Sequence, residues 1–113
     1  MELSDYQKRS RVTAIYPNAG ANFVYPTLGL AGETGEVVEK VKKLMRNEGI
    51  ERADAVSPEW RVELAKEMGD VLWYLAQLAT EFDLDLDDIA EGNLEKLLSR
   101  KERGVLHSEG DNR

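Results

Sequence analysis

Two pairs of acidic side chains have the residue types and the spacing best suited to chemistry in this sequence. Glu33 and Glu36 lie in the stretch GLAGETGE, and Glu67 and Asp70 lie in KEMGDVLWY. Residues three apart are neighbours on the surface of a helix, so the two acids of each pair share one face. Each pair also borders a stripe of apolar residues at helical spacing. If the two helices pack antiparallel, four carboxylates meet at the margin of a core.

Four carboxylates in one place are unfavourable unless something offsets their charge. Like charges in a partly buried site repel, so one or more of them would bind a proton. A divalent cation removes this repulsion, and oxygen ligands suit Mg²⁺, which keeps several waters for substrate phosphates; Mn²⁺ could substitute for it. The plainer interpretation is that each pair only forms a solvated helix face. Two pairs, each beside a glycine and next to an apolar stripe, favour the metal site.

Glycine recurs in the first acidic stretch at Gly29, Gly32 and Gly35. Each glycine inside a helix costs about 1 kcal/mol relative to alanine. Glycine also lets a second backbone or a ligand approach where a side chain would intrude. The GxxGxxG spacing differs from the GxGxxG of a phosphate-binding loop, and no strand is predicted before it. We therefore expect these glycines to make room beside the acids.

The elements that must position these acids are helices. Apolar residues recur at helical spacing along most of the chain, and no stretch alternates with the period of a strand. We predict a single all-α domain over residues 1–113, near the common domain size. Its helices are expected at residues 4–16, 27–46, 58–82 and from Asp85 or Asp87 to about 103, with Gly104 as the stop.

Capping residues mark the predicted helix starts. Ser4 or Asp5 would cap the first helix and Thr27 the second. Ser57 followed by a proline at the first helical position is a good start signal for the third helix. The tail at residues 105–113, VLHSEGDNR, would be disordered on composition alone.

The second half of the third predicted helix, residues 71–79 (VLWYLAQLA), is apolar almost all round. A helix of this kind has to be buried on every side. Three partner helices in one small chain can hardly enclose it. We therefore expect a four-helix bundle that is completed by association with another copy.

Composition excludes some classes of function. The net charge of −7 argues against broad contact with a nucleic acid polymer, which normally needs a basic face. No apolar run approaches the ~20 residues of a membrane span, and the start MELSDYQKRS lacks the apolar core of a signal peptide. The chain also has no cysteine, which fits a reducing compartment. We expect a cytoplasmic protein without a membrane partner.

Four segments resemble the MazG-like members of the all-α nucleoside triphosphate pyrophosphohydrolase superfamily. They are LGLAGETGEVVEKVKK at 28–43, ELAKEMGDVLWYLAQLA at 63–79, NLEKLLSR at 93–100 and RGVLHSEGDNR at 103–113. The resemblance implies Mg²⁺-dependent hydrolysis between the α- and β-phosphates of a nucleoside triphosphate, which gives the monophosphate and pyrophosphate. It also implies a helical homodimer or homotetramer.

The resemblance assigns roles to particular residues. By position, the metal ligands would be Glu33, Glu36, Glu67 and Asp70. The family's N-x-x-K-x-x-x-R element, which contacts phosphate or the metal-bound nucleotide, corresponds to Asn93, Lys96 and Arg100. Some relatives carry a further Glu directly before the first ligand, where this chain has Gly32. The general base is therefore left open among Glu36, Glu39 and Glu63.

Further candidates for substrate binding follow from position. Lys96, Arg100 and Arg103 recur at helical spacing and could offset charge on the leaving pyrophosphate, although a basic last turn also stabilises a helix dipole. Tyr74 lies one turn after Asp70, where its ring could stack on a base or simply join the core.

The ending of the chain also recurs among MazG-like proteins. We therefore expect the tail to fold over the nucleotide, with Asp111 or Arg113 in contact with it. Two alternatives remain open for the whole protein. One is a non-catalytic helical interaction module, and the other is the same site acting on an alarmone or a nucleoside diphosphate.

Overall fold

The computed structural model describes residues 1–106 and Gly110. The described chain is helical and contains no strand, which confirms the all-α prediction. The elements are α1 (Leu3–Ser10), the 3-10 turn η1 (Arg11–Thr13), α2 (Val24–Glu48), the 3-10 turn η2 (Ala53–Ala55), α3 (Pro58–Glu81) and α4 (Leu86–Glu102).

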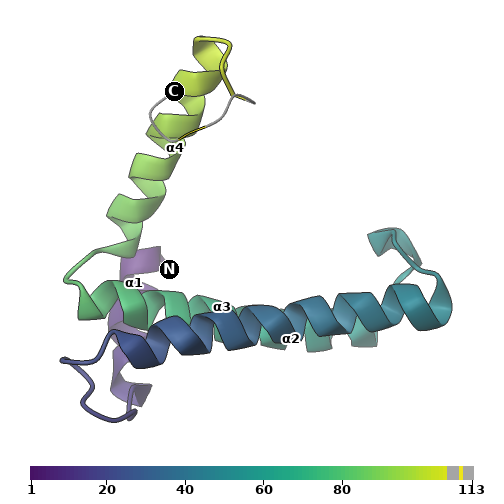
Figure 1. Cartoon of the computed structure of the whole chain (residues 1–113), viewed down its shortest axis with the longest axis horizontal. Coiled ribbons are helices and arrows are strands. Elements are labelled where there is room, and N and C mark those ends of the chain that lie inside the picture. The colour runs from purple at the N-terminus through teal and green to yellow at the C-terminus, as the bar shows by residue number, and fades with distance from the viewer. Residues whose placement is uncertain (107–109, 111–113) are drawn as a thin grey trace.

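The long helices α2 and α3 form an antiparallel hairpin, and this hairpin is the main packing unit of the chain (Figure 1). Helix α1 packs against α3 and α4, and α4 projects away from the hairpin. The radius of gyration is 17.1 Å, whereas a compact domain of this length has about 13 Å. One chain alone is therefore an open structure rather than a closed four-helix bundle, and closure by another copy stays a prediction.

The first helix is shorter than predicted and starts earlier. Its N-cap is Glu2, which forms a reciprocal capping box with Asp5, so the predicted caps Ser4 and Asp5 are wrong. The helix ends at Ser10 rather than at residue 16 and continues only as the turn η1. The Ser4 hydroxyl instead lies 2.7 Å from an Asp85 carboxylate oxygen at the start of α4. This contact ties α1 to the start of α4.

The second helix also starts before the predicted cap. It begins at Val24, and the hydroxyl of Thr27 donates to the carbonyl of Phe23, so Thr27 lies inside the first turn. The side-chain oxygen of Asn22 accepts the backbone N–H of Tyr25 and satisfies one of the free donors there. The helix ends at Glu48, where Gly49 adopts a left-handed conformation with φ of 67°.

The predicted starts of the last two helices are confirmed. Ser57 accepts the backbone N–H of Trp60 at the start of α3. Asp85 accepts the backbone N–H groups of Asp87 and Asp88 at the start of α4. After α4 the chain turns at Gly104, which has φ of 74°, as the predicted stop requires.

The buried core of the described chain is small. Its one contact cluster in the described residues consists of Ala76, Ala79 and Leu86, with Tyr6 packed against them, and Tyr16 and Leu44 are buried apart from it. In the apolar segment at residues 71–79, Leu75 keeps 38% of its surface exposed, so one chain does not enclose this segment. None of the described helices combines the length and the apolar character needed to cross a membrane.

Candidate metal centre

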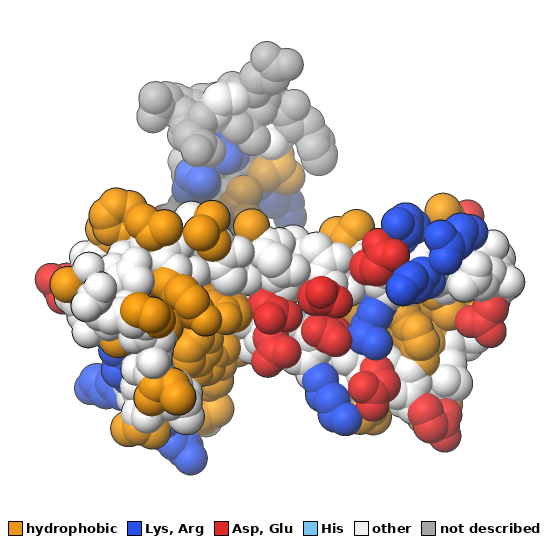
Figure 2. Space-filling view, turned by 60° about the horizontal axis from the view of Figure 1, so that its bottom comes forward, with side chains coloured by type: hydrophobic (Ala, Val, Ile, Leu, Met, Phe, Trp, Pro, Cys, Tyr) orange, Lys and Arg blue, Asp and Glu red, His pale blue; other side chains and the backbone are white. Residues whose placement is uncertain are grey.

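Three of the four predicted metal ligands meet where α2 faces α3. Glu33, Glu67 and Asp70 each offer a carboxylate oxygen, and these oxygens all lie within 4.8 Å of one another. Glu33 and Glu67 are half-buried and Asp70 is exposed. Figure 2 shows acidic side chains gathered over the middle of the hairpin. We call these three residues the acidic triad.

Repulsion among neighbouring carboxylates marks the electrostatics of the triad. Burial raises the pKa of Glu33, and the charges of Asp70, Glu67 and Glu36 raise it further. Glu36 is exposed and is not one of the three converging residues, but it is close enough for its charge to act on Glu33. A divalent cation bound to oxygen ligands would offset this repulsion, so the donor set fits such an ion.

The nearby basic side chains pair with other acids. Lys66 lies 3.1 Å from Glu63, and Lys42 lies 2.9 Å from Glu39. In the described part of the chain, no lysine or arginine forms an ion pair with the triad. Of the three candidate bases, Glu63 and Glu39 are therefore ion-paired on the surface, whereas Glu36 lies beside the triad.

One of the glycines makes room for a side chain, rather than for the backbone or ligand that was predicted. A Cβ atom on Gly29 would overlap the ring of Tyr74, so this glycine makes room for an aromatic side chain next to the triad. At Gly32, Gly35 and Gly69 an added Cβ atom would meet no described atom within 4 Å. In the part of the chain that the structure describes, no other segment therefore comes close to these three glycines.

The candidate phosphate-binding residues of the described chain lie on α4 or, for Arg103, directly after it, and α4 points away from the triad of the same chain (Figure 1). Asn93 is exposed and Lys96 is half-buried. Arg100 is only 3% exposed, and its Nη2 lies 3.4 Å from the carbonyl of Gly110. Arg103 donates to the hydroxyl of Ser99. The candidates Asp111 and Arg113 lie outside the described residues.

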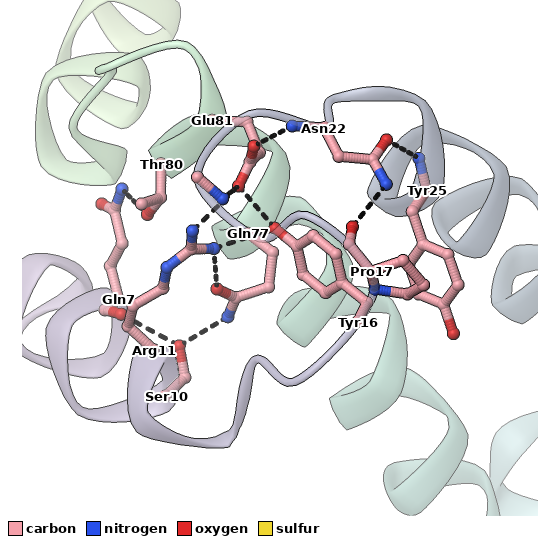
Figure 3. A network of polar contacts seen from close by, with 11 residues as sticks. Gln7, Ser10, Arg11, Tyr16, Pro17, Asn22, Tyr25, Gln77, Thr80 and Glu81 are labelled. Carbon is pink, nitrogen blue, oxygen red and sulfur yellow. Dashed lines mark hydrogen bonds and ion pairs between the residues drawn. The ribbon is translucent and has the colours of Figure 1, made fainter.

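A buried carboxylate elsewhere on α3 was not predicted from the sequence. The side chain of Glu81 is 1% exposed and lies 2.8 Å from Arg11. It also accepts hydrogen bonds from the Tyr16 hydroxyl and from the backbone N–H groups of Gly20 and Asn22 (Figure 3). Burial alone would raise the pKa of Glu81, but these hydrogen bonds outweigh it and bring the pKa to about 2. We call Glu81 and these four partners the Glu81 network.

Fold and site together define a helical protein with a carboxylate centre suited to a divalent cation. The sequence matches the MazG nucleotide pyrophosphohydrolase domain over residues 26–105, which include the whole acidic triad and nearly all of α2, α3 and α4. The chain therefore belongs to the MazG family. It is also 44% identical to the Gene 37 protein of Mycobacterium phage L5, over 118 aligned positions that cover all of both chains. No solved structure matches the chain.

Proposed function

We propose that the protein is an Mg²⁺-dependent nucleoside triphosphate pyrophosphohydrolase that releases pyrophosphate and the nucleoside monophosphate. The observation that carries this proposal is the convergence of Glu33, Glu67 and Asp70 from two helices, within 4.8 Å and without a basic partner in the described chain. Membership of the MazG family supports the reaction class. A bound divalent cation would neutralise phosphate charge and lower the pKa of the attacking water.

The acidic residues would have two roles, metal binding and proton transfer. The triad holds the cation, and Glu36 is the proposed proton acceptor because it is exposed beside Glu33 and has no lysine partner in the described chain. A general base has to be within reach of the water from which it takes a proton. Glu63 and Glu39, each paired with a lysine, are less suited to this role.

The basic residues of α4 would act in an assembly. Since α4 points away from the triad of its own chain, we propose a homodimer or homotetramer in which α4 and the tail of one copy approach the triad of another. Lys96 and Arg103 would then stabilise the leaving pyrophosphate. A cytoplasmic location is part of the same proposal.

The test is to incubate the protein with a panel of nucleoside triphosphates and Mg²⁺ and to measure pyrophosphate. We expect release from at least one of them, and a loss of at least about 100-fold in Glu67→Gln because a metal ligand is removed. Glu51→Gln is the matched control, since Glu51 is an exposed acid in the loop between α2 and α3. Absence of release from every nucleotide, or equal rates in the wild type and Glu67→Gln, would refute the proposal.

A further inference from the structure

Four aromatic rings form a continuous wall beside the acidic triad. Tyr16 and Tyr25 stack with their ring centroids 5.0 Å apart and an interplanar angle of 10°. The ring centroids of Tyr25 and Tyr74 are 6.3 Å apart, and those of Tyr74 and Trp73 are 5.0 Å apart with the two rings nearly perpendicular. We call these four residues the aromatic wall. Figure 2 shows apolar side chains directly beside the acidic group on the hairpin.

The wall and the triad belong to one surface. Tyr74 lies one helical turn after Asp70, and the charges of Glu33 and Asp70 both act on its hydroxyl group. Tyr25 precedes Glu33 on α2 by eight residues, or about 12 Å along the helix axis. An extended nucleotide spans such a distance, so a ligand with its phosphates at the triad can reach Tyr25.

Tyr25 is supported from one side and keeps part of its ring open. One face is covered by Tyr16, which is only 7% exposed, whereas Tyr25 itself is 43% exposed. The Glu81 carboxylate fixes Tyr16 through its hydroxyl and Asn22 through its backbone N–H. Asn22 in turn accepts the backbone N–H of Tyr25 (Figure 3). An exposed ring that is already immobilised loses little further entropy when a ligand stacks on it.

We infer that Tyr25 is the platform on which the base of the bound nucleotide stacks, with the Glu81 network as its support. The inference rests on the proposed function, because it places the base relative to phosphates held at the triad. Aromatic side chains stack on any nucleobase, since every base has a π-face. This subsite therefore recognises the presence of a base, and it discriminates weakly among bases. The sequence alone had pointed only to Tyr74.

Two substitutions at position 25 separate ring stacking from simple apolar bulk. Tyr25→Leu keeps an apolar side chain but removes the ring, and Tyr25→Phe keeps the ring. We expect Tyr25→Leu to raise the Kd for a nucleoside triphosphate with Mg²⁺ roughly 5- to 100-fold, which is the usual effect of losing one base–aromatic stack. Tyr25→Phe should bind like the wild type.

The controls use probes that carry no base. The affinities for Mn²⁺ alone and for inorganic tripolyphosphate with Mg²⁺ should be the same in the wild type and Tyr25→Leu. Val24→Ala is the matched control variant, because Val24 is 54% exposed and adjacent in sequence but points about 100° away around the helix. Its nucleotide affinity should equal that of the wild type.

The outcomes distinguish this inference from the proposed function. If the wild type binds and hydrolyses nucleotides and Tyr25→Leu does so equally well, the inference is overturned and the proposed function stands. Weaker binding of Mn²⁺ and tripolyphosphate in Tyr25→Leu would also overturn it, because Tyr25 would then only maintain the fold. If the wild type neither binds nor hydrolyses any nucleotide, the proposed function itself fails.

Discussion

Helix α3 contributes to two carboxylate clusters that differ in how their negative charge is balanced. Near its C-terminal end, the buried Glu81 is surrounded by donors from the N-terminal segment, and its pKa falls to about 2. Near its middle, Glu67 and Asp70 meet Glu33 without a cationic partner in the described chain, and the pKa of Glu33 is raised. The first cluster is complete within the protein. A bound cation would offset the repulsion in the second.

Replacing one carboxylate by an amide should change the free energy of unfolding in opposite directions in the two clusters, and the change at Glu81 is the largest that we expect. Glu81→Gln should lower the free energy of unfolding by about 3 kcal/mol, because it leaves Arg11 and the other donors without a charged acceptor. The melting temperature should fall by roughly 10 °C. Glu33→Gln should leave the metal-free protein as stable as the wild type or more stable, because it removes repulsion. Thermal unfolding followed by circular dichroism measures both variants. A similar fall in the melting temperature of the two would show that the clusters do not differ in this way.

Acid should also lower the free energy of unfolding through the Glu81 network, but more gradually than Glu81→Gln does. The pKa of Glu81 is depressed in the folded state, so its contribution to stability is present above its ordinary value of 4.5 and is lost as the pH falls toward 2. We expect the free energy of unfolding of the wild type to decrease in this range more steeply than that of Glu81→Gln. Urea titrations across the range measure this difference, and parallel curves for the two proteins would show that Glu81 does not titrate as proposed.

The smallest expected effect concerns the open glycines beside the triad. Gly32→Ala and Gly35→Ala should each stabilise the protein by about 0.5–1 kcal/mol, because alanine favours the helix and its Cβ meets no atom within 4 Å. Gly32 lies one turn before Glu36 and so shares a face of α2 with the proposed proton acceptor, whereas Gly35 is turned about 100° away from Glu36. Only Gly32→Ala should raise the KM for nucleotide. Equal KM values for the two variants would place the nucleotide elsewhere.

The acidic triad could be predicted from the sequence because its signal is local. Acids spaced three apart beside an apolar stripe determine which face of each helix they occupy, and the antiparallel hairpin then brings Glu33 to Glu67 and Asp70. The caps Ser57 and Asp85 were predictable for the same reason. Thr27 was not a cap because Asn22, farther upstream, satisfies the first turn of α2.

The Glu81 network and the direction of α4 could not be predicted in this way. The partners of Glu81 lie 59 to 70 residues away in sequence, and nothing in the local pattern marks them. The direction of α4 depends on a short turn in which Asp83 adopts a positive φ of 55°, and hydropathy does not report such backbone geometry. The sequence therefore indicated that Lys96 and Arg100 share a helix, but not that this helix points away from the triad.

If the acidic triad is a site for a divalent cation, the melting temperature of the protein should depend on Mg²⁺. A ligand that binds only the folded state at 100 times its Kd adds about 2.7 kcal/mol of stability, which is on the order of 10 °C for a domain of this size. We expect this increase in the wild type and none in Glu67→Gln, whose metal-free melting temperature should be at least as high as that of the wild type. No increase in the wild type, or an equal increase in Glu67→Gln, would contradict the account.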